Sequence, residues 1–336
     1  MKSIITKGII YTGIFEKVEW SGSIRTSTRT LEVTYLKDKA KFNLGQEIEF
    51  AVDNKKIFIG KIFKLSQNTT EETNTLIAYD NAISLNKNNF IENYCNIPPS
   101  NIAKNIITRL KIEVGELPPD RTKCTFPALD RTGYEIILMA YKLQAAKDNK
   151  VYSIISENNK ISVVEQGILI PNLILNSSIN VREATYSESI EEMVNKVILY
   201  ETAEGESKTV AIKENKEEIE KYGVFQRVQE QDKNSEVYLQ INSILKGIQE
   251  SSDLTTDGNI YLMSGYSIPL KIKTISKLNL IFLIESDRHV WTSNDYYTQI
   301  SLAFENMMND VDIDSTKKKE EFEVIPQNKS GAGDPY

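Results

Sequence analysis

Alternating apolar and polar positions dominate the first 85 residues of the chain. From Leu31 to Tyr35 every second side chain is apolar, which is the period of a half-buried strand. The segment Asp53-Asn54-Lys55 has the composition of a tight turn between two such stretches. The alternating or apolar stretches are 31–35, 48–52, 57–63 and 76–80. Short strands joined by turns predict a small barrel or sandwich over residues 1–85.

The hydrophobic period becomes helical after residue 86. Ser100 precedes apolar residues spaced by three and four positions, which predicts a helix with Ser100 as its N-cap. Thr132 and Glu135 stand at capping-box spacing and predict a second helix. The expected apolar faces are Ile102, Ala103, Ile106, Ile107 and Leu110 in the first helix, and Tyr134, Ile137, Leu138, Tyr141 and Ala145 in the second. The second face could line a ligand groove, but a core role is favoured. With a hairpin at 151–164, these elements predict an inserted α+β domain over residues 86–180.

Helical and strand patterns alternate over residues 181–255 and predict a mixed α/β segment there. Ser189 and Glu192 stand at capping-box spacing and predict a short helix that runs into a strand at 196–200. The charged run 213–221 predicts a solvated helix, which Gly223 would end in a left-handed conformation. A longer amphipathic helix is expected to bury Val237, Ile241, Ile244, Leu245 and Ile248 on one face.

Strand patterns return near the end of the chain. Alternating or continuous apolar residues mark three strands, at 268–272, 278–284 and 296–304. With strands contributed by 181–230, they predict a second small β-barrel over residues 256–312. Residues 313–336 have no apolar period and predict a flexible tail, whose deletion should leave the fold intact.

Composition excludes several classes of protein. The 336 residues include 40 Lys and Arg against 47 Asp and Glu, a net charge of -7, whereas nucleic-acid binders carry a basic excess. No apolar run approaches the roughly 18 residues that a membrane span needs, and the first residues lack a signal-peptide core. We therefore expect a protein that is made in the bacterial cytoplasm and does not bind membranes by itself.

Few residues in the sequence have the type and spacing that catalysis or metal binding requires. Cys95 and Cys124 have no His or Cys at metal-ligand spacing and are interpreted as reduced, mostly buried thiols, with no disulfide expected in the cytoplasm. His289, in the polar run 286–289, cannot build a zinc site alone and is expected to pack or hydrogen-bond on a hairpin turn. None of the 47 acidic residues forms a pair that the sequence singles out as glycosidase carboxylates. The sequence predicts no catalytic, cofactor-binding or metal-binding residues.

Several short sequence words resemble one protein family. They are, in order, Phe58-x-Gly60, Ala78-Tyr79-Asp80, Ser189-Ile190-Glu191-Glu192-Met193-Val194-Asn195-Lys196-Val197, Tyr222-Gly223, and the glycine pair Gly258 and Gly265 around a hairpin. Together they resemble the baseplate hub proteins of contractile phage tails, in particular the PBSX-type, XkdQ-like hub, over residues 10–305. The resemblance implies an α+β, mainly β fold: two small tudor-like β-barrels with an inserted α+β domain.

The resemblance also implies a mechanical function without catalysis. Three hub chains with two barrels each would form a ring of six barrel positions, which joins the sixfold tail tube to the threefold central spike. The implied partners are two further copies of the chain, the tube and spike proteins, LysM-type or other baseplate proteins, and the tape-measure protein or DNA that passes through the lumen. The implied location is the tail baseplate of a phage or of a headless bacteriocin, and the sequence does not distinguish these two particles.

Two alternative functions remain open. Tails often carry cell-wall hydrolases, and others carry carbohydrate- or receptor-binding modules. A binding module would expose aromatic platforms, but the only tryptophans, Trp20 and Trp291, fall in separate predicted domains.

Overall fold

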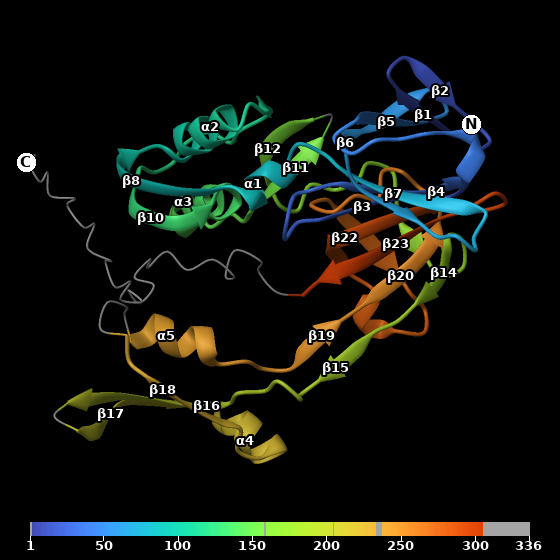
Figure 1. Ribbon diagram of the computed structural model, residues 1–336. Helices are drawn as coiled ribbons and strands as arrows, with labels where there is room; N and C mark the ends of the chain where they lie inside the picture. The colour runs from blue at the N-terminus through green and yellow to red at the C-terminus, as the bar shows by residue number, and fades with distance from the viewer. Residues whose placement is uncertain (1, 158, 204, 233–236, 305–336) are drawn as a thin grey trace, which may run out of the picture.

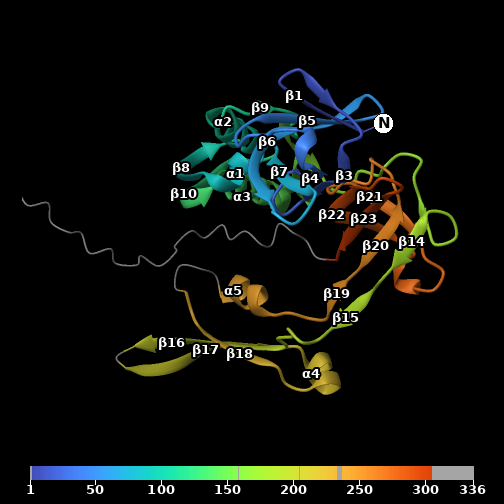
Figure 2. The same ribbon diagram turned by 45° about the vertical axis from the view of Figure 1, so that its right-hand side comes forward.

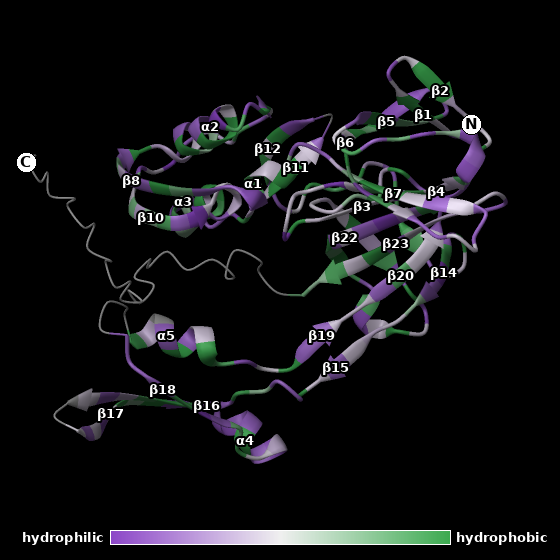
Figure 3. Ribbon diagram, in the orientation of Figure 1, coloured by the Kyte–Doolittle hydropathy of each residue, from purple (hydrophilic) through white to green (hydrophobic). Residues whose placement is uncertain are grey.

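The chain is mainly β, as expected. The computed structural model describes residues 2–157, 159–203, 205–232 and 237–304, so the expected tail at 313–336 lies outside the described residues. Figure 1 shows a large strand-rich body, a helical unit beside it and a smaller arm that extends from the body. Figure 3 shows hydrophobic and hydrophilic residues mixed along the strands of the body, as expected for sheets with one buried face.

One large sheet forms the body. Its strand order is β14-β20-β23-β22-β3-β4-β7-β6-β5-β1-β2, and β13 and β21 attach beside β22. The strands are β1 (Lys2–Thr6), β2 (Ile9–Tyr11), β3 (Phe15–Ser23), β4 (Thr30–Leu36), β5 (Glu47–Val52), β6 (Lys55–Gln67), β7 (Thr73–Tyr79), β13 (Leu175–Asn176), β14 (Val181–Ala184), β20 (Asp253–Asp257), β21 (Ser267–Lys271), β22 (Ile281–Trp291) and β23 (Tyr296–Ala303). The alternation predicted at Leu31, Val33 and Tyr35 is confirmed, because all three side chains are buried.

An early strand and a late strand of the described residues pair in this sheet, which the sequence did not predict. β3 and β22 pair antiparallel, with Trp20 opposite His289 and Gly22 opposite Asp287. We expected two separate closed barrels, but the pairings of the described strands form one continuous path with no closed ring. We call the β3–β22 pairing the seam.

Each half of the sheet surrounds its own hydrophobic core. The first core includes Ile4, Val18, Leu31, Phe50 and Leu76, from β1 to β7, and receives Trp291 from β22 across the seam. The second includes Leu254, Ile268, Leu270, Ile284 and Ile300, from β20 to β23.

Two details differ from the sequence prediction: the chain between Gly258 and Gly265 forms turns, and Ser276–Leu278 is a 3₁₀ helix before β22 begins. A second 3₁₀ helix follows β4 at Lys37–Lys39.

The helical unit packs three helices and short sheets around a separate core. Its elements are α1 (Ile83–Lys87), β8 (Asn89–Ile97), α2 (Pro99–Arg109), β9 (Glu113–Val114), β10 (Cys124–Thr132), α3 (Gly133–Asp148), β11 (Tyr152–Glu157) and β12 (Lys160–Glu165). Both predicted helices and the predicted hairpin are confirmed. Ser100 is not an N-cap, because α2 begins at Pro99 and the Ser100 hydroxyl donates a hydrogen bond to Asp120 Oδ2 at 2.6 Å.

The predicted capping box of α3 is present. The Thr132 Oγ1 accepts a hydrogen bond from the Glu135 N–H at 3.2 Å, and the Glu135 carboxylate accepts one from the Thr132 N–H at 2.8 Å. We expect Thr132→Ala to lower the free energy of unfolding by about 1 kcal/mol in denaturant titrations, because one free amide of the helix start loses its acceptor. Thr108→Ala, on the exposed face of α2, should change it by about 0.5 kcal/mol or less. Equal effects would show that the box contributes nothing.

The arm spans residues 187–251. A two-stranded ribbon, β15 (Ser187–Ser189) with β19 (Gln249–Ser251), connects it to the body, and both views show it extending away (Figures 1 and 2). Beyond the ribbon lie β16 (Lys196–Ala203), β17 (Glu206–Glu214), α4 (Lys216–Tyr222), β18 (Gln226–Glu230) and α5 (Val237–Ile244). The predicted helix ending at Gly223 is confirmed, with φ of 88° at the glycine.

One prediction for the arm is wrong, and two others are confirmed only in part. Ser189 ends a strand instead of capping a helix, and its hydroxyl accepts a hydrogen bond from the Glu191 N–H in a turn. The amphipathic helix ends at Ile244, because Lys246 pairs with Val194 as an isolated bridge. Strands β16, β17 and β18 pair with one another and do not join the sheet formed by residues 256–304. Among the described strands of residues 181–230, β14 is the one that joins the large sheet, through its pairing with β20.

Candidate functional site at the seam

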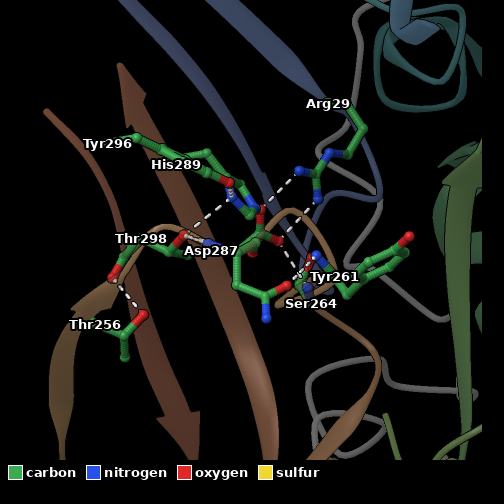
Figure 4. Close-up of polar contacts among 9 residues, drawn as sticks. Arg29, Thr256, Tyr261, Ser264, Asp287, His289, Tyr296 and Thr298 are labelled. Carbon is green, nitrogen blue, oxygen red and sulfur yellow. Dashed lines mark hydrogen bonds and ion pairs between the residues drawn. The ribbon is translucent and has the colours of Figure 1, made fainter. Parts of the chain in front are cut away.

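Charged and aromatic side chains are buried where the seam joins the two halves of the sheet. Figure 4 shows the Asp287 carboxylate of β22 between the Arg29 guanidinium and the His289 imidazole. Arg29 comes from the loop before β4, so the cluster connects segments 258 residues apart in the sequence. All three side chains are at most 6% exposed.

Arg29 and Asp287 form a bidentate ion pair. Arg29 Nη1 lies 2.8 Å from Asp287 Oδ1, and Nη2 lies 2.6 Å from Oδ2. The carboxylate also accepts a hydrogen bond from the Ser264 N–H at 2.7 Å. Burial by itself raises the pKa of Asp287, but Arg29 and His289 outweigh it and hold that pKa well below the usual range. The Arg29 guanidinium carbon lies 3.9 Å from the centre of the Trp20 ring, a cation–π contact.

His289 lies inside β22, so the prediction of a turn position is wrong. Its Nδ1 lies 3.2 Å from both Tyr296 Oη and Thr298 Oγ1, and its Nε2 lies 3.2 Å from Asp287 Oδ2. Burial lowers the pKa of the imidazole more than Asp287 raises it, so the ring is neutral at pH 7. The side chain is 0% exposed, and no substrate can reach it without opening the sheet.

Both tryptophans belong to this junction. The His289 ring centre lies 4.9 Å from that of Trp20 and 6.0 Å from that of Trp291. The two side chains, which the sequence places in different predicted domains, thus pack into one hydrophobic core. Each is only 4% exposed, so neither forms an exposed aromatic platform for a carbohydrate.

A glycine makes room for the Arg29 side chain. A Cβ at Gly22 would lie 2.8 Å from the Arg29 Cδ and Cζ carbons, which is closer than real contacts allow. We expect Gly22→Ala to lower the free energy of unfolding by about 1 to 2 kcal/mol, because the guanidinium must shift from its ion pair. Thermal denaturation with Gly247→Ala as control, where the nearest atom is 3.3 Å away on a flexible Glu218 side chain, tests this. A smaller loss for Gly22→Ala than for Gly247→Ala would contradict it.

Asp80 is a second buried carboxyl beside Arg29. It follows β7 and is 4% exposed, and its Oδ1 accepts a hydrogen bond from the Ala82 N–H at 3.1 Å. Its backbone N–H donates to the Arg29 carbonyl at 3.1 Å. Burial raises the pKa of Asp80 to about 6, although contacts with Ser156, Arg29 and Ala82 oppose the rise. The carboxyl therefore changes charge near neutral pH.

The cysteines and most of the acidic residues lie outside the seam. Cys124 is buried, and burial raises its thiol pKa to about 11, whereas Cys95 is exposed on β8, contrary to the expectation of burial. Within the part of the chain that the structure describes, no group of three or more His, Cys, Asp or Glu side chains could hold a metal ion. In the same part, no helix has the length and hydrophobicity to cross a bilayer.

Comparisons with known proteins agree on one family and fold. A family model described as YqbQ-like matches residues 18–303. Among curated proteins, the chain is 25% identical to the uncharacterized protein YqbQ of Bacillus subtilis over 79% of the chain and 83% of that protein. It is 22% identical to the phage-like element PBSX protein XkdQ of the same species, over 88% and 94%.

Two solved structures have a similar fold over almost their full length. One is the 43 kDa tail protein of prophage MuSo2 from Shewanella oneidensis, with a TM-score of 0.66 and 14% identity. The other is a tail protein from Neisseria meningitidis, with a TM-score of 0.65 and 12% identity. Each match covers 92% of this chain and 98% of the solved chain.

Proposed function

This chain belongs to the YqbQ-like family, and from that premise we propose that it is the baseplate hub of a contractile tail. Its sequence similarity to the PBSX protein XkdQ and its fold identify it as a phage tail baseplate protein. The observation that carries the proposal is the structural match to two tail proteins, one of them from a prophage, over 92% of the chain. The hub role is a trimeric adapter between the sixfold tail tube and the threefold central spike.

The two-core body supports this role in mechanical terms. An adapter of this kind needs two similar units per chain at a fixed relative angle, so that three chains present six positions. The two cores are the candidate units, each barrel-like in the proposal, and the seam fixes them to each other through backbone pairing and the Arg29–Asp287 ion pair. The division of the chain at residues 85, 180, 255 and 312 stays a prediction.

The proposed partners follow from the position between tube and spike. They are two further copies of the chain, the tail tube protein, the central spike protein and LysM-type or other baseplate proteins. A chain with a net charge of -7 suits a lumen through which DNA or a tape-measure protein slides without binding. Assembly would take place in the bacterial cytoplasm before the protein becomes part of the particle.

Imaging of purified tails tests the proposal. The expected result is three copies of the chain at the junction of tube and spike, with the two core units alternating around the axis. A single copy, six copies, or a position on peripheral fibres contradicts the hub role. The isolated chain can be monomeric if trimerisation requires the tube or spike. Its mass in solution is therefore a weaker test of the hub role than imaging of whole tails.

The proposed mechanical role needs no hydrolysis of the cell wall, which is the main alternative function. We expect no release of soluble fragments from purified cell walls by the pure protein, because His289 is fully buried and no acid pair is singled out. Release of fragments that is abolished by changing a single carboxylate would establish an enzyme instead.

A further inference from the structure

The two strands that connect the arm to the body are interrupted at the same level. Residues 185–186 separate β14 from β15, and Ser252 separates β19 from β20. The pairs β14–β20 and β15–β19 share one register next to this break, so the ribbon continues the edge of the large sheet. We call residues 185–186 and Ser252 the hinge.

Side-chain hydroxyls replace part of the backbone ladder at the hinge. The Thr185 N–H donates to the Asp253 carbonyl at 2.9 Å. A regular hydrogen-bonded pair would return this bond to the Thr185 carbonyl, but the Asp253 N–H donates to Thr185 Oγ1 at 3.4 Å. The Thr185 carbonyl accepts instead from the Ser252 hydroxyl at 2.7 Å. Positions at the ends of elements are where proteins absorb changes in backbone direction, so the chain can bend here.

Two glutamates face each other directly beyond the hinge. Glu188 of β15 and Glu250 of β19 are opposite each other in register. Like charges in this arrangement destabilise a pair of strands. Hydrogen bonds from Lys277 and Tyr186 hold the pKa of Glu188 below its usual range, so this carboxylate is ionised at neutral pH. A cation beside the two glutamates therefore stabilises the ribbon.

That cation comes from the body. Lys277 Nζ lies 2.8 Å from Glu188 Oε1 and 3.7 Å from Glu250 Oε1. One ammonium group thus contacts both strands of the ribbon and offsets their repulsion.

The loop that carries Lys277 is packed firmly onto the body. Leu278, the next residue, is fully buried in the second core. Asn279 closes the loop, because its Oδ1 accepts a hydrogen bond from the Ile272 N–H at 3.0 Å and its Nδ2 donates to the Ile272 carbonyl at 3.2 Å. The position of the ammonium group is therefore set by the body.

Tyr186 connects the hinge to the same two glutamates. Its ring packs against the second core, with its centre 6.0 Å from that of Phe304. Its hydroxyl lies 3.0 Å from Glu188 Oε1 and also contacts Glu250 Oε1, so its proton can be donated to either carboxylate. Two side chains anchored on the body thus hold two side chains of the ribbon.

We propose that Tyr186 and Lys277 form a latch that holds the ribbon against the body and so fixes the direction in which the arm extends (Figures 1 and 2). When the latch opens, the arm turns about the hinge as a unit, because it has a core of its own, formed by Val194, Val197, Leu199 and Ile241. The inference concerns the single chain and does not depend on the proposed function.

Distances between two spin labels test the latch. Glu183→Cys places one label on the exposed side of β14 in the body, and Thr209→Cys places the other on β17 of the arm. Cys95→Ser removes the exposed native thiol. Pulsed electron spin resonance of the full chain then gives the distribution of distances between the labels, which should be narrow while the latch is intact. Lys277→Glu should broaden it about twofold, because three carboxylates then repel one another.

Three further variants separate the latch from a general effect of charge. Lys273→Glu makes the same change in an exposed residue of the same loop and should leave the distribution unchanged. Adding Glu188→Lys to Lys277→Glu places a cation between two carboxylates again and should restore the narrow distribution. Lys277→Met removes the charge without adding another, so it should broaden the distribution less. It provides the same test if Lys277→Glu does not fold.

Salt provides a second readout. The Lys277 and Glu188 side chains are 58% and 46% exposed, so ions in solution can screen their attraction. The screening length falls to about 3 Å in 1 M salt, and the distribution of the wild-type latch should then broaden toward that of Lys277→Met.

Several outcomes would overturn the latch. They are an unchanged distribution in both Lys277 variants, equal broadening by Lys273→Glu and Lys277→Glu, and no recovery when Glu188→Lys is added. The number of copies of the chain in purified tails does not enter any of these measurements. Failure of the hub proposal and failure of the latch are therefore distinguishable.

Discussion

Arg29→Met should lower the free energy of unfolding by about 3 to 5 kcal/mol, because it leaves the Asp287 carboxylate buried without its cation. Asp287 is 2% exposed and holds Arg29 through two hydrogen bonds of 2.8 and 2.6 Å. Methionine keeps most of the aliphatic volume, so the loss reports charge more than packing. Denaturant titration followed by tryptophan fluorescence measures the effect, since Trp20 and Trp291 both lie at this junction.

Two comparisons identify the cause of this loss. Arg25→Met removes an ion pair with Glu285 in which the Arg25 side chain is 50% exposed, and it should cost less than about 1 kcal/mol. Combining Arg29→Met with Asp287→Leu removes the unpaired charge, so the double variant should be more stable than Arg29→Met alone. A double variant that is less stable than Arg29→Met would show that Asp287 contributes mainly through Ser264 and His289.

Local patterns in the sequence predicted local structure well. The alternation around Val33 gives β4, the turn at Asp53 and Asn54 has positive φ at both residues, and Thr132 with Glu135 caps α3. These features depend on side chains within a few positions of one another, so a short window contains their physical cause. Ser189 is a counterexample: it has capping-box spacing, but the pairing of β15 with β19 holds the segment extended.

The seam could not be predicted in this way because its partners are far apart in sequence. The polar run Ser286-Asp287-Arg288-His289 has the composition of an exposed turn, and this placed His289 wrongly. Arg29 neutralises Asp287 from 258 residues away, which allows a charged stretch to form the middle of a buried strand. The β3–β22 pairing, which joins the two predicted barrel regions in one sheet, was not predicted for the same reason, since no local pattern relates these two segments.

Asp80→Asn should increase the free energy of unfolding at pH 7 to 8 by about 3 kcal/mol, because burial raises the pKa of this carboxyl from 3.8 to about 6 and each pKa unit corresponds to about 1.4 kcal/mol. An acid with a raised pKa in the folded state favours folding fully only below its unfolded pKa. That contribution is lost as the pH rises through about 6. Asparagine carries no charge and can still accept the Ala82 hydrogen bond.

The size of the Asp80 effect depends on pH, and this dependence distinguishes it from a general effect of removing a charge. At pH 4 the wild-type carboxyl is largely neutral in the folded state, so Asp80→Asn should change stability little there, and the two stability curves should separate between pH 4 and pH 7. Asp38→Asn, in the exposed 3₁₀ helix after β4, makes the same change in net charge and should show no comparable gain. If Asp80→Asn is destabilising at pH 7, the attraction between the Asp80 carboxylate and Arg29 outweighs the cost of burial. In that case Asp80, Arg29 and Asp287 act as one ionised triad that joins the helical unit to the seam.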